Sequence, residues 1–187
     1  MILCHFTTAR HLKGIGKHGL TIGDVPTDLR RGQGRVGIWL TTSEDVTGHG
    51  FGGERSTPSH RLTIELPDDA PGLVRWSEWA EEHVTVETAA NLKTCAGKDG
   101  PSQWQTWWVS FPPVPRSRIV ACRDLASGTD VEAWSEILIP SAEHSRTVLS
   151  SSLSVPAWRR DTWHRQLTKS WQRHLKAMEQ AGGRISL

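Results

Sequence analysis

Three short segments of this 187-residue chain carry side chains that could do chemistry. His5 and Thr7 end an apolar opening run, and a neutral imidazole can donate one hydrogen bond while it accepts another. Glu136 stands in a late apolar run, and a middle run ends in three hydroxyls, Thr41, Thr42 and Ser43. A carboxylate on a rigid strand favours a transition state in which positive charge develops on a sugar ring. These residue types can therefore bind hydroxyl groups and stabilise positive charge that develops in a transition state.

Each of these residues also has a purely structural interpretation. His5 lies between Cys4 and Phe6 and could be a hydrogen-bonded core histidine, and the three hydroxyls could simply end a strand. Strand alternation puts Glu136 and Leu138 on one face, where a carboxylate is costly unless it is partnered, functional or at a solvated edge. We favour the functional interpretation of His5 and Glu136.

Hydrophobic periodicity and turn residues predict the elements that position these side chains. Met1–Phe6 is expected to form a buried strand, and Ala9–His18 a helix that Gly19 ends. Further strands are predicted over Arg35–Thr42, Arg61–Leu66, Gln103–Ser110, Ile119–Asp124 and Glu132–Ile139. Helices are predicted over Trp76–His83 and within Val84–Cys95, and an exposed loop over Asp24–Gly34. A strand-rich body with few helices predicts an α+β fold.

The last part of the chain differs in composition. Pro156–Leu187 contains seven Lys or Arg and two acidic residues. Apolar residues recur there at steps near four, namely Trp158, Trp163, Leu167, Trp171, Leu175 and Met178. This spacing predicts a long amphipathic helix whose basic faces could follow a phosphate backbone or simply face solvent. We therefore expect a body over residues 1–150 and a basic helix within 151–187 packed on it.

Bulk composition excludes several classes of protein. The net charge of +2 gives no chain-wide argument for nucleic-acid binding. The three cysteines are odd in number and lack metal spacing, which favours reduced thiols in a cytoplasmic protein. No apolar run approaches the roughly 18 residues of a membrane span, and the opening residues lack the order of a signal peptide. His49 and His60 suggest no third ligand, so no metal site is expected.

Taken in this order, the three segments resemble the ADP-ribosyltransferase superfamily. The resemblance uses His5-Phe6-Thr7 with the helix up to Gly19-Leu20, then Gly37–Ser43, then Ser135–Pro140. It is closest to bacterial and phage members that begin H-[FY]-T, including toxin-type enzymes that modify nucleic acid. It implies an ADP-ribosyltransferase-like fold in which two small twisted, mainly antiparallel sheets frame a cleft for NAD.

The resemblance also implies an activity and roles for individual residues. The chain would transfer ADP-ribose from NAD, its substrate, to a nucleic acid or a protein and release nicotinamide. His5 would bind the adenosine ribose, Thr7 the nicotinamide end, and Glu136 would be the catalytic carboxylate. The nicotinamide pocket would be lined by Thr41, Thr42 and Ser43, and the candidates for the NAD phosphates are Arg10, Arg30, Arg31 and Arg35. Members that modify arginine usually carry Glu or Gln where this chain has Trp134, which argues against an arginine acceptor.

Two other functions stay open from the sequence. One is NAD-dependent removal of a 2′-phosphate from RNA, a reaction on a related fold that needs basic residues around the phosphate and need not use Glu136. The other is a non-catalytic module that binds nucleic acid or a partner through the basic tail and the tryptophans. Trp104, Trp107 and Trp108 could stack on bases, but such a cluster is more often core.

Overall fold

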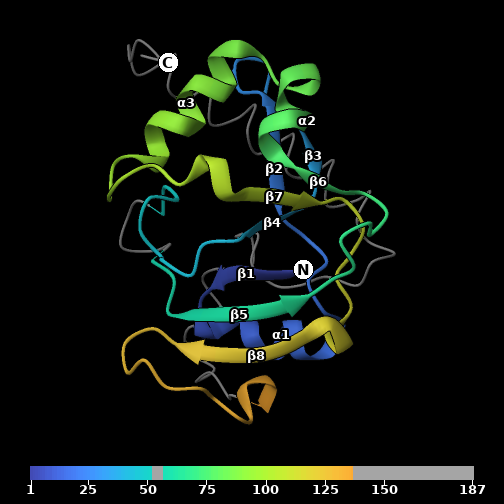
Figure 1. Cartoon of the computed structure of the whole chain (residues 1–187), viewed down its shortest axis with the longest axis vertical. Coiled ribbons are helices and arrows are strands. Elements are labelled where there is room, and N and C mark those ends of the chain that lie inside the picture. The colour runs from blue at the N-terminus through green and yellow to red at the C-terminus, as the bar shows by residue number, and fades with distance from the viewer. Residues whose placement is uncertain (52–56, 137–187) are drawn as a thin grey trace.

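The computed structural model describes residues 1–51 and 57–136. Within them, a six-stranded sheet runs through the molecule in the order β6-β7-β4-β1-β5-β8, with every neighbouring pair antiparallel (Figure 1). Its strands are β1 (Ile2–Thr7), β4 (Ile38–Thr41), β5 (His60–Glu65), β6 (Leu73–Arg75), β7 (Trp107–Ser110) and β8 (Ile119–Asp124). The remaining strands, β2 (Asp24–Asp28) and β3 (Gln33–Val36), form a separate hairpin. The α+β class is confirmed, but one continuous sheet and a hairpin replace the two small sheets that were expected.

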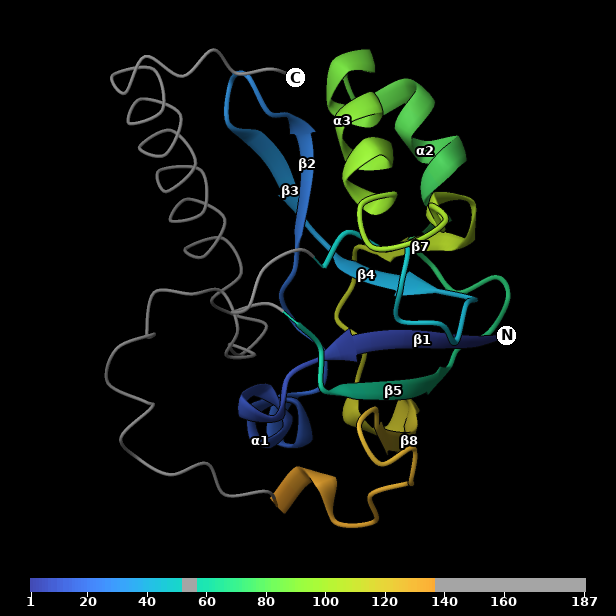
Figure 2. The ribbon, with the colours of Figure 1, turned by 90° about the vertical axis from the view of Figure 1, so that its left-hand side faces the viewer.

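Helices cover opposite faces of the two halves of the sheet (Figure 2). Helix α1 (Ala9–His18) lies against β1, β5 and β8, and we call this side the α1 face. Helices α2 (Trp76–His83) and α3 (Val86–Ala96) lie on the other side, beside β4 and β7, which we call the α2–α3 face. The sequence predicted the bounds of α1, α2 and β8 correctly.

Strand alternation divides the core between these two faces. Residues Leu3, Leu12, Ile15, Ile38, Leu40, Leu62 and Ile64 belong to the cluster under α1. Residues Val25, Trp76, Trp79, Trp107 and Val109 belong to the cluster under α2 and α3. Trp107 is buried there, as the core interpretation of the tryptophans predicted.

The shortest strand pairing in the described part of the sheet is the one between β1 and β4. Strand β1 pairs with β5 along its whole length, from Ile2 to Thr7. It pairs with β4 at a single position, Cys4 opposite Thr41, in a part of the chain that the structure fully describes. We call this junction the β1–β4 seam. It places β1, which carries the first polar segment (His5–Thr7), next to β4, which carries part of the second (Gly37–Ser43).

The hairpin corrects one prediction from the sequence. Asp24–Gly34, which was expected to be an exposed loop, forms β2 and half of β3. The backbone N–H of Thr85 donates to the Thr27 carbonyl at 2.9 Å, and the Leu29 N–H donates to Thr88 Oγ1 at 3.0 Å. The composition of this segment favours a loop, but its contacts with α3 stabilise it as a strand.

The strand predicted over Glu132–Ile139 is wrong in its described part. Trp134–Glu136 form a 3-10 turn, η3, and two similar turns are η1 (Trp104–Thr106) and η2 (Arg116–Arg118). Trp134 is 3% exposed, with the Arg116 guanidinium 4.4 Å from its ring centroid. Burial of this indole against the α1 core takes the place of strand pairing. Residues 137–139, the predicted helix within 151–187 and the boundary at 150 lie outside the described residues.

Gly19 ends α1 in a conformation that only glycine adopts readily. Its φ is 73° and its ψ is −167°, and a Cβ there would overlap the carbonyl oxygen of Val114. We expect Gly19→Ala to lower the free energy of unfolding by about 2–3 kcal/mol in a urea titration. The control is Gly97→Ala, where φ is −81° and the nearest atom to a Cβ lies at 3.6 Å. The control should change stability by less than about 0.5 kcal/mol; equal losses would contradict the role given to Gly19.

Candidate active site

His5 bridges the β1–β4 seam. Its Nδ1 donates to the carbonyl oxygen of Trp39 at 2.9 Å, because a carbonyl can only accept. Burial lowers the pKa of His5, and the hydrogen bond to Trp39 opposes this only in part, so the ring is neutral at neutral pH. The neutral ring therefore presents Nε2 as an acceptor. A ligand that meets His5 at Nε2 must supply a donor such as a ribose hydroxyl.

Thr7 belongs to a polar cluster at the start of α1. His11 Nε2 accepts from Arg10 Nε at 3.0 Å, which leaves the ring proton on Nδ1, 3.2 Å from Thr7 Oγ1. Burial, helped by the charge of Arg10 and by His5, lowers the pKa of His11 to about 3. A neutral His11 thus connects Thr7 to the Arg10 guanidinium. The sequence singled out Thr7 and Arg10 but not the histidine between them.

The hydroxyls of the second segment are used unequally. Thr41 is buried, and its Oγ1 lies 2.7 Å from Thr106 Oγ1 and accepts from the Ser43 N–H at 3.0 Å. Since Thr106 Oγ1 donates to the Gln103 carbonyl, Thr41 must donate to Thr106. Its hydroxyl therefore joins β4 to η1. Ser43 Oγ accepts from the Asp45 N–H at 3.2 Å, whereas the Thr42 side chain is exposed.

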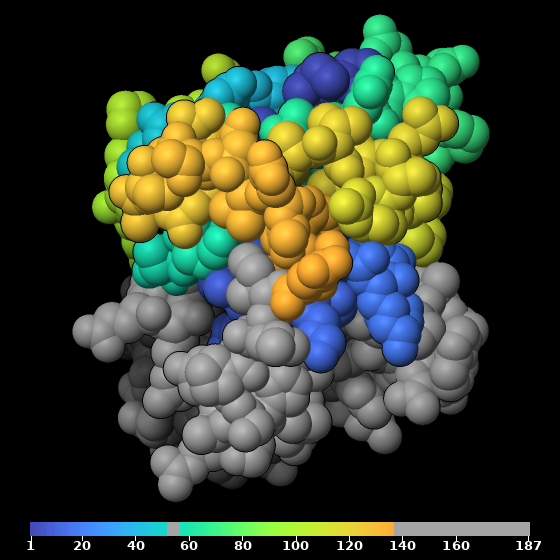
Figure 3. Space-filling view, turned by 90° about the horizontal axis from the view of Figure 1, so that it is seen from below, coloured from blue at the N-terminus to red at the C-terminus, as the bar shows by residue number. Residues whose placement is uncertain are grey.

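Glu136 lies away from the seam in the described structure. It is the last residue of η3 and its side chain is exposed. The turn packs on α1 so closely that a Cβ at Gly16 would overlap Ser135. Figure 3 shows the segment around residues 125–136 on the surface beside α1, and Figure 2 shows η3 beyond α1 and β8. The structure brings His5 to Trp39 of the second segment and Thr7 to His11, but it does not bring Glu136 to them.

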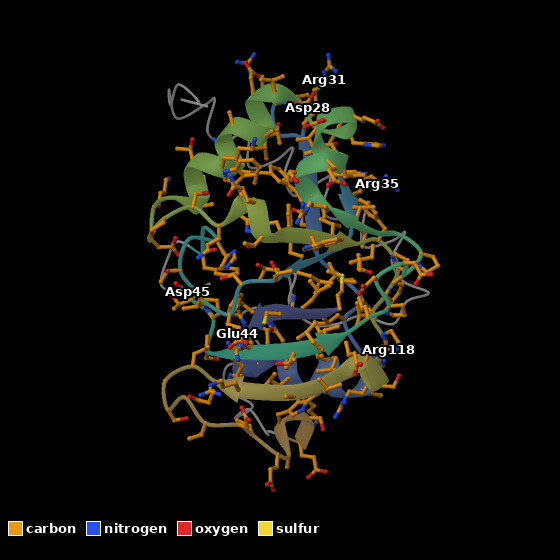
Figure 4. The ribbon with its side chains drawn as sticks, in the orientation of Figure 1. Asp28, Arg31, Arg35, Glu44, Asp45 and Arg118 are labelled. Atoms are coloured by element: carbon orange, nitrogen blue, oxygen red, sulfur yellow. The ribbon has the colours of Figure 1, made fainter. Side chains whose placement is uncertain are left out.

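The four candidate arginines have different surroundings. Three of them belong to the β2–β3 hairpin and have partners there or on its neighbours. Arg30 Nη2 lies 2.7 Å from Glu87 Oε1, and Arg31 Nε lies 3.7 Å from Asp28 Oδ2. The Arg35 guanidinium lies 4.2 Å from the Phe111 ring centroid. Figure 4 shows Arg31 and Asp28 at the far end of this hairpin. Arg10, joined through His11 to Thr7, is therefore the candidate that lies next to the first segment.

Two further polar side chains, those of Thr21 and Asp24, were not predicted from the sequence. Residues 20–24 form the connector that follows α1 and runs into Asp24, the first residue of β2. The Gly37 N–H, one residue before β4, donates to the Gly23 carbonyl at 3.2 Å. Within the described residues, Thr21 Oγ1 and Asp24 Oδ1 are buried without a hydrogen-bond partner. Burial raises the pKa of Asp24 to about 7. An Asp before a Pro-containing, Gly-rich stretch gives no sequence signal of burial, so this site could not be foreseen.

No protein family, curated protein or solved structure matches the chain. The described residues contain no helix long and apolar enough to cross a membrane. They also contain no group of three or more His, Cys, Asp or Glu side chains that could hold a metal ion. A function for this chain therefore depends on the seam and on the motif resemblance.

Proposed function

We propose that this protein binds NAD at the β1–β4 seam and transfers its ADP-ribose to a macromolecular acceptor. The observation that carries the proposal is the hydrogen bond from His5 Nδ1 to the Trp39 carbonyl across the point where β1 and β4 part. It places His5 of the first segment beside Trp39 of the second segment, so a ligand bound at His5 would lie against β4. The resemblance of these segments to ADP-ribosyltransferases supplies the identity of the ligand.

The surroundings of the seam suit each part of NAD. His5 Nε2 accepts from a hydroxyl of the adenosine ribose. Arg10 supplies positive charge next to the seam for the diphosphate, and a guanidinium matches phosphate oxygens well. Glu136 is kept as the catalytic carboxylate on the strength of the motif alone, and its charge would stabilise the oxocarbenium-like ribose. An ADP-ribosyltransferase-like fold is part of the same proposal.

Labelled NAD tests the proposal directly. The full chain is incubated with NAD carrying one label in nicotinamide and another in adenine, together with total lysate, and products are treated with nuclease or protease. We expect nicotinamide release and adenine label in a polymer that one treatment removes. Release of nicotinamide with 2′-phosphorylated RNA alone would favour the 2′-phosphotransferase instead. Absence of NAD binding and of release would leave a non-catalytic binding module.

Two substitutions of His5 separate its two nitrogens. In His5→Asn the side-chain amide can still donate to the Trp39 carbonyl, but the Nε2 acceptor is lost. In His5→Gln the longer amide reaches the Nε2 position. We expect NAD affinity, measured by calorimetry, to fall about 10-fold in the Asn variant and less than about 3-fold in the Gln variant. The reverse order would show that Nδ1, and not Nε2, matters to the ligand.

A further inference from the structure

The connector 20–24 carries two buried polar atoms that the fold leaves unsatisfied. Thr21 is 2% exposed, and neither Thr21 Oγ1 nor Asp24 Oδ1 has a hydrogen-bond partner among the described residues. A buried polar atom without a partner costs free energy, so most are bonded in native proteins. Unsatisfied atoms of this kind therefore indicate a group that the described residues do not supply.

The side chains of Asp24 and His5 both point away from the core under α2 and α3. Val25 packs in that core, so strand alternation in the hairpin turns its neighbour Asp24 away from it. His5 lies two residues after Leu3 in β1, so the two side chains share one face of the strand, and Leu3 packs in the core under α1. Both side chains are thus directed away from the core under α2 and α3.

Trp39 connects the two residues. Its carbonyl oxygen accepts from His5 Nδ1 at 2.9 Å, and its indole Nε1–H donates to the backbone carbonyl of Asp24 at 2.6 Å. One residue of β4 therefore contacts both His5 and Asp24. Asp24, through its backbone, and His5, through its ring, are therefore both hydrogen-bonded to one residue of β4 at the seam.

We propose that Asp24, with the Thr21 hydroxyl from the same connector, binds the vicinal hydroxyls of the adenosine ribose of NAD. This inference rests on the proposed function and assigns a subsite to it. A carboxylate accepts hydrogen bonds from the two hydroxyls of a ribose, and His5 Nε2 also offers only an acceptor. A site built from acceptors rejects a 2′-phosphate, which has lost the hydroxyl proton and brings negative charge. The subsite should therefore select NAD over NADP.

Calorimetric titration of the full chain with NAD and with NADP at about pH 8, above the pKa of about 7 to which burial raises Asp24, tests this subsite with the carboxyl ionised. We expect wild-type protein to prefer NAD by about 10- to 100-fold, which corresponds to one or two hydrogen bonds to a charged group. Asp24→Asn should bring the two affinities within about 3-fold of each other, since a neutral amide does not repel phosphate. The matched control is Asp28→Asn on the same strand, whose carboxyl bonds the Arg31 N–H instead. It should keep the wild-type preference.

Circular dichroism checks that each variant is folded, and Thr21→Val gives a second, uncharged variant. We expect Thr21→Val to bind NAD about 3- to 10-fold more weakly with its fold intact. If wild-type protein binds NAD but Asp24→Asn keeps the full preference over NADP, the subsite is overturned and the proposed function stands. If wild-type protein binds neither nucleotide, both proposals are overturned.

Discussion

Glu136→Gln should lower the rate of nicotinamide release by about 10²- to 10³-fold, the usual effect of removing one stabilising group from a developing charge. Glutamine keeps the shape of the side chain and can still accept a hydrogen bond from a ribose hydroxyl. It lacks the negative charge that favours the oxocarbenium-like ribose. NAD affinity should change less than about 3-fold, because the charge acts mainly in the transition state.

The control for this variant is Glu132→Gln. Glu132 is exposed and lies four residues before Glu136, so it tests whether loss of any acidic charge in this segment matters. Nicotinamide release by the control should equal that of the wild type. Wild-type turnover in Glu136→Gln would remove this residue from the mechanism, in agreement with its exposed position in η3 on the outside of α1.

Asp24→Asn should stabilise the protein at alkaline pH, by about 2–4 kcal/mol near pH 8. Burial raises the pKa of Asp24 from 3.8 to about 7, so the folded state favours the protonated carboxyl. The stability that Asp24 contributes is complete below its unfolded pKa and is lost as the pH rises towards 7. Asparagine is neutral throughout and loses nothing over this window.

Urea titrations at several pH values between about 4 and 8 measure this effect. The two proteins should differ least near pH 4, close to the ordinary pKa of 3.8 of an unfolded Asp24, and should diverge as the pH rises towards 7. Asp69→Asn is the control, because Asp69 is exposed and its substitution should leave the pH profile unchanged. A constant difference between wild type and Asp24→Asn at all pH values would contradict the burial of this carboxyl.

These two effects of Asp24→Asn illustrate a trade between stability and binding. The variant is expected to gain stability and to lose the preference for NAD over NADP. A carboxyl that weakens the fold at neutral pH persists more readily where it serves a ligand. If the variant gains stability but its preference for NAD over NADP does not change, Asp24 is a buried carboxyl without a role in binding.

Local patterns were sufficient to predict the elements with strong periodicity or clear ends. Helix α1 has two inward positions, Leu12 and Ile15, and a glycine stop, so its limits follow from the sequence. The hairpin could not be predicted, because β2 depends on contacts of Thr27 and Leu29 with α3. Propensity has no information on such tertiary partners.

The surroundings of the candidate residues could be predicted only in part, for the same reason. The neighbourhood of His5 and the second segment follows from the order of strands, whereas the individual hydroxyls depend on partners distant in sequence. Thr41 was expected to contact the ligand, but its hydroxyl bonds Thr106, 65 residues along the chain. The strand expected around Glu136 failed because one indole, that of Trp134, is buried against the α1 core instead of alternating in a sheet.

The single ladder pair between Cys4 and Thr41 has a mechanical consequence. Across this junction the two halves of the sheet are joined mainly by side-chain packing, in which Ile38 and Leu40 continue the core under α1. Packing contacts allow small rotations that a row of directional hydrogen bonds resists. A modest twist about this pair would change the separation of β1 and β4 beside His5 without distorting either half. A ligand that contacts both β1 and β4 would therefore restrict the relative motion of the two halves of the sheet through a small area of contact.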